Sequence, residues 1–301
     1  MTGIEPRSHG RRLSREAVRL AMLKAAVKMA VEAGIGIGLE SLSVEEVIQN
    51  ARVPRSSVYR IWPVKEMFLD DLLCYMAGRE AYFAGRDVFD PQTFEIVAGA
   101  IEENRWRLVT PEGRREVLCE AVRLAVRRNA QALGASALAR MHSAMIATVS
   151  STGSSKVRPE IARALDEAET ASRRSIIALF RELVMPALGL RLRDPGAGLD
   201  HLVMAGGVLI QGMALRQILA EAASSEQAGP DEQATRPDAA SDSGGAALTS
   251  AQLLDCPLPG PGLDGQPAAW TLVALSYLGL IDTFLEPDPD YRNPGRAELA
   301  G

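Results

Sequence analysis

Residues 42–69 read LSVEEVIQNARVPRSSVYRIWPVKEMFL, and this stretch decides the fold. Ser43 is followed three residues later by Glu46, which is the spacing of a capping box at the start of a helix. We therefore expect a short helix over residues 44–50. Residues 51–53 then form a tight turn, because the next residue, Pro54, suits the first turn of a new helix.

Helices are also expected on both sides of this pair. The second short helix runs from Pro54 to about Arg60, and a third helix begins near Pro63 or Val64 and continues to about Ala84. Before the pair, Ser14 is a suitable N-cap for a longer helix that ends near Ala33, with apolar residues at helical spacing. The segment 14–65 is therefore expected to be a three-helix domain.

The remainder of the chain also favours helices. Hydrophobic residues make up 47% of the 301 residues but aromatic residues only 5%, and this composition favours an all-α fold over a β-rich one. No stretch shows a convincing alternation of apolar and polar residues. Proline or glycine separates the expected helices, which cover 91–107, 111–132, 136–150, 159–188, 199–223 and 268–286.

The charges are unevenly distributed along the chain. Residues 1–65 carry eleven Lys and Arg against six Asp and Glu, whereas residues 66–301 carry twenty-two against thirty-two. A basic N-terminal segment on an acidic body indicates that the N-terminal segment contacts a polyanion.

Two short helices joined by a three-residue turn form the layout of a helix-turn-helix. Its inward positions are apolar: Val44, Val47, Ile48, Val53 and Val58. The exposed positions of the second helix are Arg55, Ser56, Ser57, Tyr59 and Arg60, and these side chains can donate hydrogen bonds to base edges and phosphates. The candidate DNA-binding residues are Arg52, Arg55, Ser56, Ser57, Tyr59, Arg60 and Lys65.

The same stretch resembles the DNA-binding signature of the TetR family of bacterial repressors. Residues of that pattern are Tyr59, Trp62, Lys65, Glu66 and Met67, with Gly34 after the first helix. The resemblance covers about residues 14–72. One departure is Arg52, which stands where the family usually has glycine; if this residue needs a positive φ, arginine costs about 1 kcal/mol there.

The resemblance implies the following functional expectations. The chain is a cytoplasmic homodimer that binds a near-palindromic double-stranded DNA operator and is released by a small apolar effector. Members of the family usually repress transcription, and activation is the alternative. The body, residues 66–286, is then a helical bundle for effector binding and dimerisation.

Within that body, the resemblance indicates two kinds of site. Six residues lie on helices where the family places its effector cavity: Trp106, Cys119, Met141, His142, Met145 and Thr148. The helices 199–223 and 268–286 are the candidate dimer helices. Gly206, Gly207 and Gly212 would let a partner backbone approach, although packing within one chain is the alternative.

Three segments are expected to lack regular structure. Residues 1–13 form a basic tail, residues 224–267 form a flexible insertion rich in Pro, Gly, Ser and Asp, and the tail 287–301 has a similar composition. A helical adaptor that uses the insertion, with Pro257, Pro259 and Pro261, to bind proteins is the alternative function.

Other function classes find little support in the sequence. Three cysteines without metal-ligand spacing indicate a reducing compartment and no structural metal. No stretch of 18 clean apolar residues appears, so no membrane span is expected. No catalytic constellation stands out; we therefore expect no enzyme activity, no catalytic residues and no cofactor.

Overall fold

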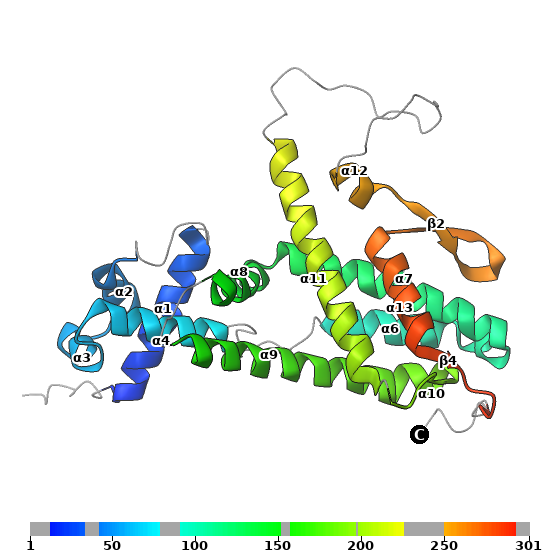
Figure 1. Ribbon diagram of the computed structural model, residues 1–301, viewed down its shortest axis with the longest axis horizontal. Helices are drawn as coiled ribbons and strands as arrows, with labels where there is room; N and C mark the ends of the chain where they lie inside the picture. The colour runs from blue at the N-terminus through cyan, green and yellow to red at the C-terminus, as the bar shows by residue number, and fades with distance from the viewer. Residues whose placement is uncertain are drawn as a thin grey trace, which may run out of the picture. The chain divides into compact units, whose positions relative to one another are not determined.

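The computed structural model describes residues 13–33, 42–78, 91–151, 157–196, 198–225 and 250–292, and helices dominate these residues (Figure 1). The prediction of a mainly α-helical chain is therefore confirmed. The helices are α1 (Arg15–Ala33), α2 (Val44–Ala51), α3 (Arg55–Ile61), α4 (Lys65–Ala77), α6 (Pro91–Glu103), α7 (Pro111–Ala135), α8 (Ala137–Ser151), α9 (Arg158–Leu179), α10 (Met185–Leu188), α11 (Gly198–Ser225), α12 (Ser250–Asp255) and α13 (Leu272–Phe284).

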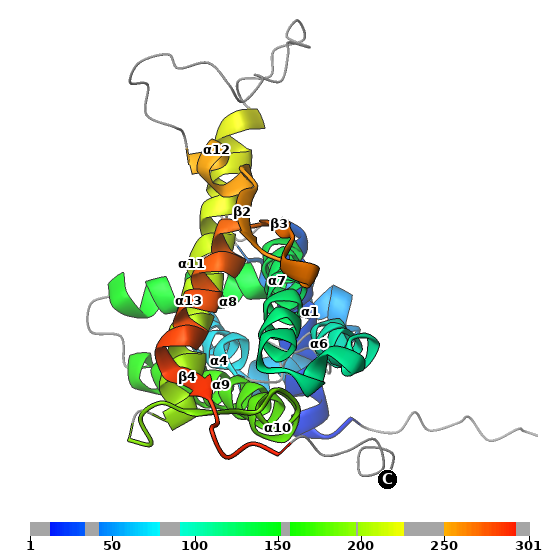
Figure 2. The same cartoon turned by 90° about the vertical axis from the view of Figure 1, so that its right-hand side faces the viewer.

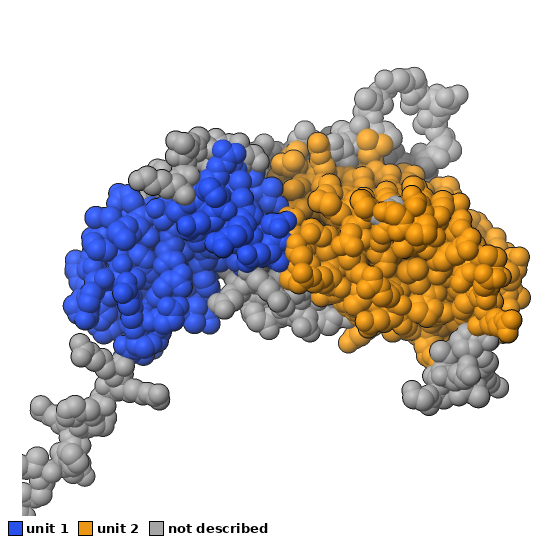
Figure 3. Space-filling view, turned by 60° about the horizontal axis from the view of Figure 1, so that its bottom comes forward, with its two compact units in different colours: residues 1–85, 141–168 blue, residues 86–140, 169–301 orange. Residues whose placement is uncertain are grey.

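The chain divides into two compact units (Figure 3). Unit 1 comprises residues 1–85 and 141–168, and unit 2 comprises residues 86–140 and 169–301. The sequence predicted a domain over residues 14–65 and a body over residues 66–286, whereas this division groups α4, most of α8 and the first half of α9 with α1–α3.

In unit 1, caps and buried apolar side chains define the N-terminal helices. Ser14 Oγ accepts the Ala17 N–H at 3.1 Å and Ser43 Oγ accepts the Glu46 N–H at 3.4 Å, as the capping residues predict. The ring of Trp62 meets that of Phe68 edge-on, with centroids 5.1 Å apart. The core side chains that are less than 2% exposed include Val18, Met22, Leu23, Val47, Val58, Phe68 and Leu72.

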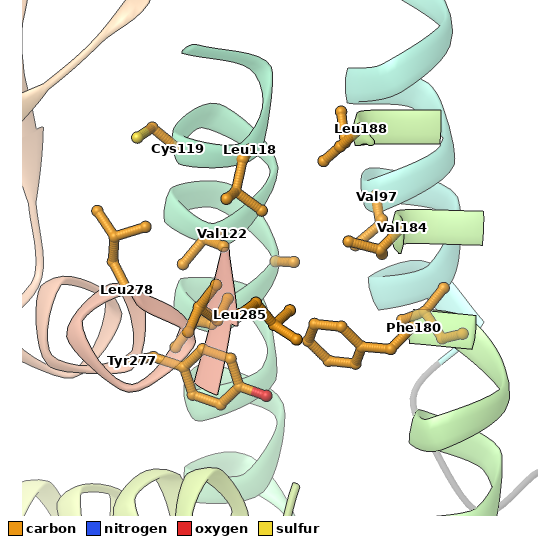
Figure 4. Packing of buried hydrophobic residues seen from close by; sticks show 14 of the residues in the cluster. Val97, Leu118, Cys119, Val122, Phe180, Val184, Leu188, Tyr277, Leu278 and Leu285 are labelled. Atoms are coloured by element: carbon orange, nitrogen blue, oxygen red, sulfur yellow. The ribbon is translucent and has the colours of Figure 1, made fainter. Parts of the chain in front are cut away.

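In unit 2, α7 lies at the centre of one hydrophobic cluster, to which α6, α10, α11 and α13 contribute. Figure 4 shows Leu118 and Val122 of α7 in this cluster with Tyr277 and Leu278 of α13, and Figure 2 shows α11 beside α13. Between α9 and α10 the helix widens to a π-helical turn, Phe180–Val184, in which the Met185 N–H bonds Phe180 O. Pro186 follows directly and has no N–H to continue the α-helical ladder.

The prediction of a flexible insertion over residues 224–267 is wrong for the last part of that segment, because residues 258–270 form a hairpin. Strand β2 (Leu258–Pro261) pairs antiparallel with β3 (Pro267–Trp270). Trp270 is 1% exposed and donates its Nε1–H to Pro261 O at 2.9 Å. Strands of four residues are too short to show an alternation of apolar and polar residues. One buried Trp among prolines and glycines therefore did not indicate a hairpin in the sequence.

The tip of this hairpin is fixed to α7 by polar contacts. Arg107, in the 3₁₀ turn η2 (Arg105–Val109), bonds Glu116 at 2.9 Å and Asp264 at 2.7 Å. The other carboxylate oxygen of Glu116 accepts the Gly265 N–H at 3.1 Å. The hairpin therefore packs as part of unit 2, and α13 begins at Leu272 instead of Ala268, with Thr271 as its N-cap.

The prediction of an unstructured tail from residue 287 is wrong for residues 287–292. Strand β4 (Leu285–Pro287) pairs with β1 (Leu190–Leu192). Beyond it, the Tyr291 hydroxyl donates to Ala187 O at 3.1 Å, and its ring covers Gly189, where an added Cβ would lie 2.6 Å from ring atoms. Residues 293–301, the tail 1–12, the loop at Gly34 and residues 226–249 of the insertion lie outside the described residues.

Among the described residues, one helix is long and apolar enough to span a membrane by length and composition alone. It covers Gly198–Ala223 of α11, with a mean hydropathy of 1.5 over its most apolar 18-residue window, of which 28% is buried.

Candidate nucleic-acid interface

A tight connection sets α3 against α2. Arg52 has φ 53° and ψ 42°, the left-handed conformation, and its N–H bonds Gln49 O at 3.2 Å. Val53 turns inward and is 7% exposed, while Pro54 has φ −66° and precedes the first residue of α3. Arg52 therefore has a positive φ at the position where the family usually has glycine, and the arginine carries the strain that glycine would avoid.

The structure places all seven predicted DNA-binding residues in unit 1, in or next to α3. Val58 is the buried residue of α3, so the helix packs by one side. Ser57 is half-buried, which departs from the prediction that it is exposed. The exposed members are Arg52, Arg55, Ser56, Tyr59, Arg60 and Lys65.

Lys65 is the first residue of α4, where backbone N–H groups lack intrahelical partners. The N-cap position is occupied by Val64, whose side chain accepts no hydrogen bond. A cationic side chain and the positive end of the helix therefore lie together at this point, a combination that favours an anion.

One residue at this surface was missed by sequence reasoning. Glu45 of α2 accepts the Tyr59 O–H at 2.6 Å and Arg55 Nη2–H at 2.8 Å, both on Oε1. The Arg55 guanidinium also lies over the Tyr59 ring, 5.5 Å from its centroid. We call Glu45, Arg55 and Tyr59 the Glu45 cluster. No sequence signal indicates which first-turn acid of α2 faces α3, because that depends on how the two helices pack.

The Glu45 cluster changes the acid–base behaviour of the tyrosine. The hydrogen bond to Glu45 raises the pKa of Tyr59 above its usual range, with smaller contributions from desolvation and from the carboxylate charge. Arg55 opposes this shift. The phenol therefore stays protonated and serves as a hydrogen-bond donor to Glu45.

The six predicted effector-binding residues do not belong to one unit. Trp106 and Cys119 are in unit 2, and Met141, His142 and Met145 are in unit 1. Trp106 is 66% exposed, and the Arg107 guanidinium lies 4.2 Å from its ring centroid. Its side chain therefore lies at the surface and not in an enclosed cavity. Cys119 is buried in the core of unit 2, where desolvation raises the pKa of its thiol.

The residues from α8 belong to unit 1 and are buried. Met141, His142 and Met145 are each less than 5% exposed. Burial lowers the pKa of His142 to about 4, so its imidazole is neutral near pH 7. The side chain of Thr148 lies outside the described set.

A cavity of about 530 Å³ is lined by α10, β1, the start of α11 and the segment after β4. Its charged residues are Arg181, Asp200 and Asp288, and most of its other lining is apolar. None of the six predicted effector-binding residues lines it.

Within the described ranges, no three His, Cys, Asp or Glu side chains are grouped to hold a metal ion. Cys74, Cys119 and Cys256 are free thiols. Comparison of the chain with models of protein families, with curated proteins and with solved structures finds no match in any of the three.

Proposed function

We propose that this chain is a sequence-specific DNA-binding transcriptional regulator of the TetR type. In this proposal α1, α2 and α3 form a helix-turn-helix domain, and α3 is the recognition helix. The observation that carries the proposal is the surface of α3: Arg55, Ser56, Tyr59 and Arg60 are exposed, while Val58 anchors the opposite side.

The exposed side chains fit the chemistry of a DNA major groove. Arginine donates two parallel hydrogen bonds to the O6 and N7 atoms of guanine, and serine bonds several bases. In this proposal Arg52, before α3, and Lys65, at the start of α4, contact phosphates on either side of the recognition helix. The positive balance of residues 1–65 favours the same partner.

A homodimer fits the exposed apolar face of α11. Four of its large apolar side chains are from 38% to 65% exposed, and Gly207 and Gly212 have no atom within 4 Å of an added Cβ. An exposed apolar stripe of this kind supports contact with a partner helix. The four are Met204, Val208, Leu215 and Leu219.

Gly206 differs from the other two glycines of α11. An added Cβ there would collide with the ring of Tyr277 on α13, so this glycine serves packing within the chain. The dimer contact therefore rests on the face that contains Gly207 and Gly212. Two copies related by a two-fold axis would present two recognition helices to a near-palindromic site.

Regulation by a small apolar effector completes the proposal. Two recognition helices must be about 34–36 Å apart, or a multiple of this, to enter successive major grooves. An effector that binds one arrangement of the protein better than the other shifts the population and breaks this spacing. Release from the operator, and hence relief of repression, would follow.

The experiment that tests the proposal is selection of genomic DNA fragments by the full chain at roughly physiological salt. The matched control is the double variant Arg55→Ala/Tyr59→Ala. The proposal predicts that the wild type alone recovers a short near-palindrome. Failure of the wild type, also after denaturation and refolding to remove bound ligand, would overturn it and favour the helical adaptor.

A further inference from the structure

We propose that Glu45 is a specificity-determining residue of the DNA interface, because its carboxylate sets which hydrogen bonds Arg55 and Tyr59 can offer to DNA. The inference rests on the proposed function. It uses the geometry of the Glu45 cluster, in which one carboxylate oxygen receives both the Tyr59 O–H at 2.6 Å and an Arg55 N–H at 2.8 Å.

The first step concerns Tyr59. A phenol has a single O–H to donate, and in the cluster it is donated to Glu45. Phosphate oxygens only accept hydrogen bonds, so Tyr59 cannot bond a phosphate while the cluster is closed. Its oxygen still accepts, and the amino groups of adenine and cytosine are donors in the major groove. The closed cluster therefore directs Tyr59 toward bases.

The second step concerns Arg55. A guanidinium carries five N–H donors, and one of those on Nη2 is directed to Glu45. The remaining donors are enough for a two-bond contact to guanine. The contact to Glu45 and the position over the Tyr59 ring restrict an otherwise flexible side chain, so less rotamer entropy is lost when it binds a base.

The third step concerns charge. The carboxylate lies against Arg55 and offsets its attraction for phosphate, which is the sequence-independent part of DNA binding. A carboxylate also accepts a hydrogen bond from the amino group of cytosine, while it repels phosphate. Glu45 therefore weakens binding to arbitrary DNA and spares, or improves, binding to the right bases. Arg52, Arg60 and Lys65 remain exposed to supply phosphate contacts.

The test compares the wild-type chain with Glu45→Gln, a substitution that keeps the shape of the side chain but removes its charge. Glu46→Gln is the matched control, because Glu46 is the exposed neighbour in the same first turn of α2. The probes are a duplex selected by the wild type from a random pool and a shuffled duplex of equal composition. Fluorescence anisotropy from 50 to 200 mM salt gives both affinities.

We expect Glu45→Gln to lower the ratio of the affinity for the selected duplex to the affinity for the shuffled duplex about tenfold. The main cause should be tighter binding of the shuffled duplex. The slope of log affinity against log salt should steepen by about 0.9, because Arg55 is freed to contact a phosphate. Glu46→Gln should change the two affinities alike. A ¹³C-tyrosine spectrum, assigned with Tyr59→Phe, should show a lower Tyr59 pKa in Glu45→Gln than in the wild type.

The outcomes separate the two proposals. Suppose that the wild type selects a duplex but Glu45→Gln keeps the same affinity ratio and the same salt slope. The role of Glu45 is then overturned and the DNA-binding function stands. The same conclusion follows if Glu46→Gln changes the ratio and the slope as much as Glu45→Gln does. An unchanged Tyr59 pKa in Glu45→Gln likewise overturns the role of Glu45. A wild type that selects no sequence overturns both proposals.

Discussion

Asp71 on α4 holds Arg19 on α1 through a two-bond contact between carboxylate and guanidinium. Arg19 donates Nε–H to Oδ2 at 2.8 Å, and its Nη2 donates to Oδ1. The same Oδ2 accepts the Trp62 Nε1–H at 3.1 Å. One side chain thus joins the first helix, the residue that ends α3 and the helix that follows.

This contact predicts that Asp71→Ala destabilises unit 1. Removing the carboxylate leaves the buried Trp62 N–H and the Nε–H and Nη2–H of Arg19 without the acceptor that Asp71 provides, and hydrogen bonds to charged groups contribute roughly 1.5–3 kcal/mol. We expect a loss of about 2 kcal/mol in the free energy of unfolding, measured by denaturant titration of the far-UV circular dichroism. Asp70→Asn, at the exposed neighbour, is the control, and an equal loss in both variants would contradict the account.

Arg52→Gly should stabilise the protein. Arg52 has φ 53°, a conformation that glycine adopts without steric cost, and the expected gain is about 0.5–1 kcal/mol. Arg52→Ala is the control, because it removes the same charge but keeps the Cβ that causes the strain. Thermal and denaturant midpoints that rise equally in the two variants would show that the charge, and not the backbone, is responsible.

Stability should fall in mild acid because of His142. Its folded pKa of about 4 lies below the usual value of 6.5, so the unfolded chain binds more protons between these pH values. The stabilisation is complete above pH 6.5 and is lost as the pH falls toward 4. From pH 7 to pH 5 the loss is about 2 kcal/mol, at 1.4 kcal/mol per pKa unit.

The measurement for His142 is the pH dependence of the free energy of unfolding in His142→Leu and wild type. The variant should show a flatter profile between pH 7 and pH 5. His201→Gln, which removes an exposed imidazole on α11, is the control. Parallel profiles for wild type and His142→Leu would refute the prediction.

The exposed stripe on α11 predicts a dimer that a charge disrupts. Val208 is 65% exposed, and Val208→Glu would place a carboxylate in the proposed helix–helix contact. Sedimentation should show a dimer for the wild type and a monomer for the variant. Glu221→Lys, which reverses the charge of an exposed residue on another side of α11, should remain dimeric. A monomeric wild type would remove this part of the proposal.

Local patterns predicted the helices well because helix boundaries depend on nearby residues. Ser14, Ser43 and Pro54 each mark a helix start, and the structure begins α1, α2 and α3 directly after them. The glycine that the family usually has at the position of Arg52 likewise raised the question of a positive φ there, which the structure shows. Such signals act over three or four residues, and the sequence displays them directly.

Contacts between distant residues could not be predicted in the same way. Glu45 and Tyr59 meet because α2 and α3 pack at a particular angle. The hairpin at 258–270 and the segment at Tyr291 are ordered by partners far along the chain, such as Ala187 for the Tyr291 hydroxyl. Their own composition resembles that of loops, so the sequence predicted loops.

The most direct test of the central claim is the affinity of the wild type and of Arg55→Ala for the selected duplex and for its shuffled counterpart at fixed salt. The account predicts that the wild type prefers the selected duplex by about a thousandfold or more. Arg55→Ala should lose roughly 1–3 kcal/mol on the selected duplex, with little change on the shuffled one. Equal affinity of the wild type for both duplexes, or no effect of Arg55→Ala, would contradict the claim that α3 reads DNA sequence.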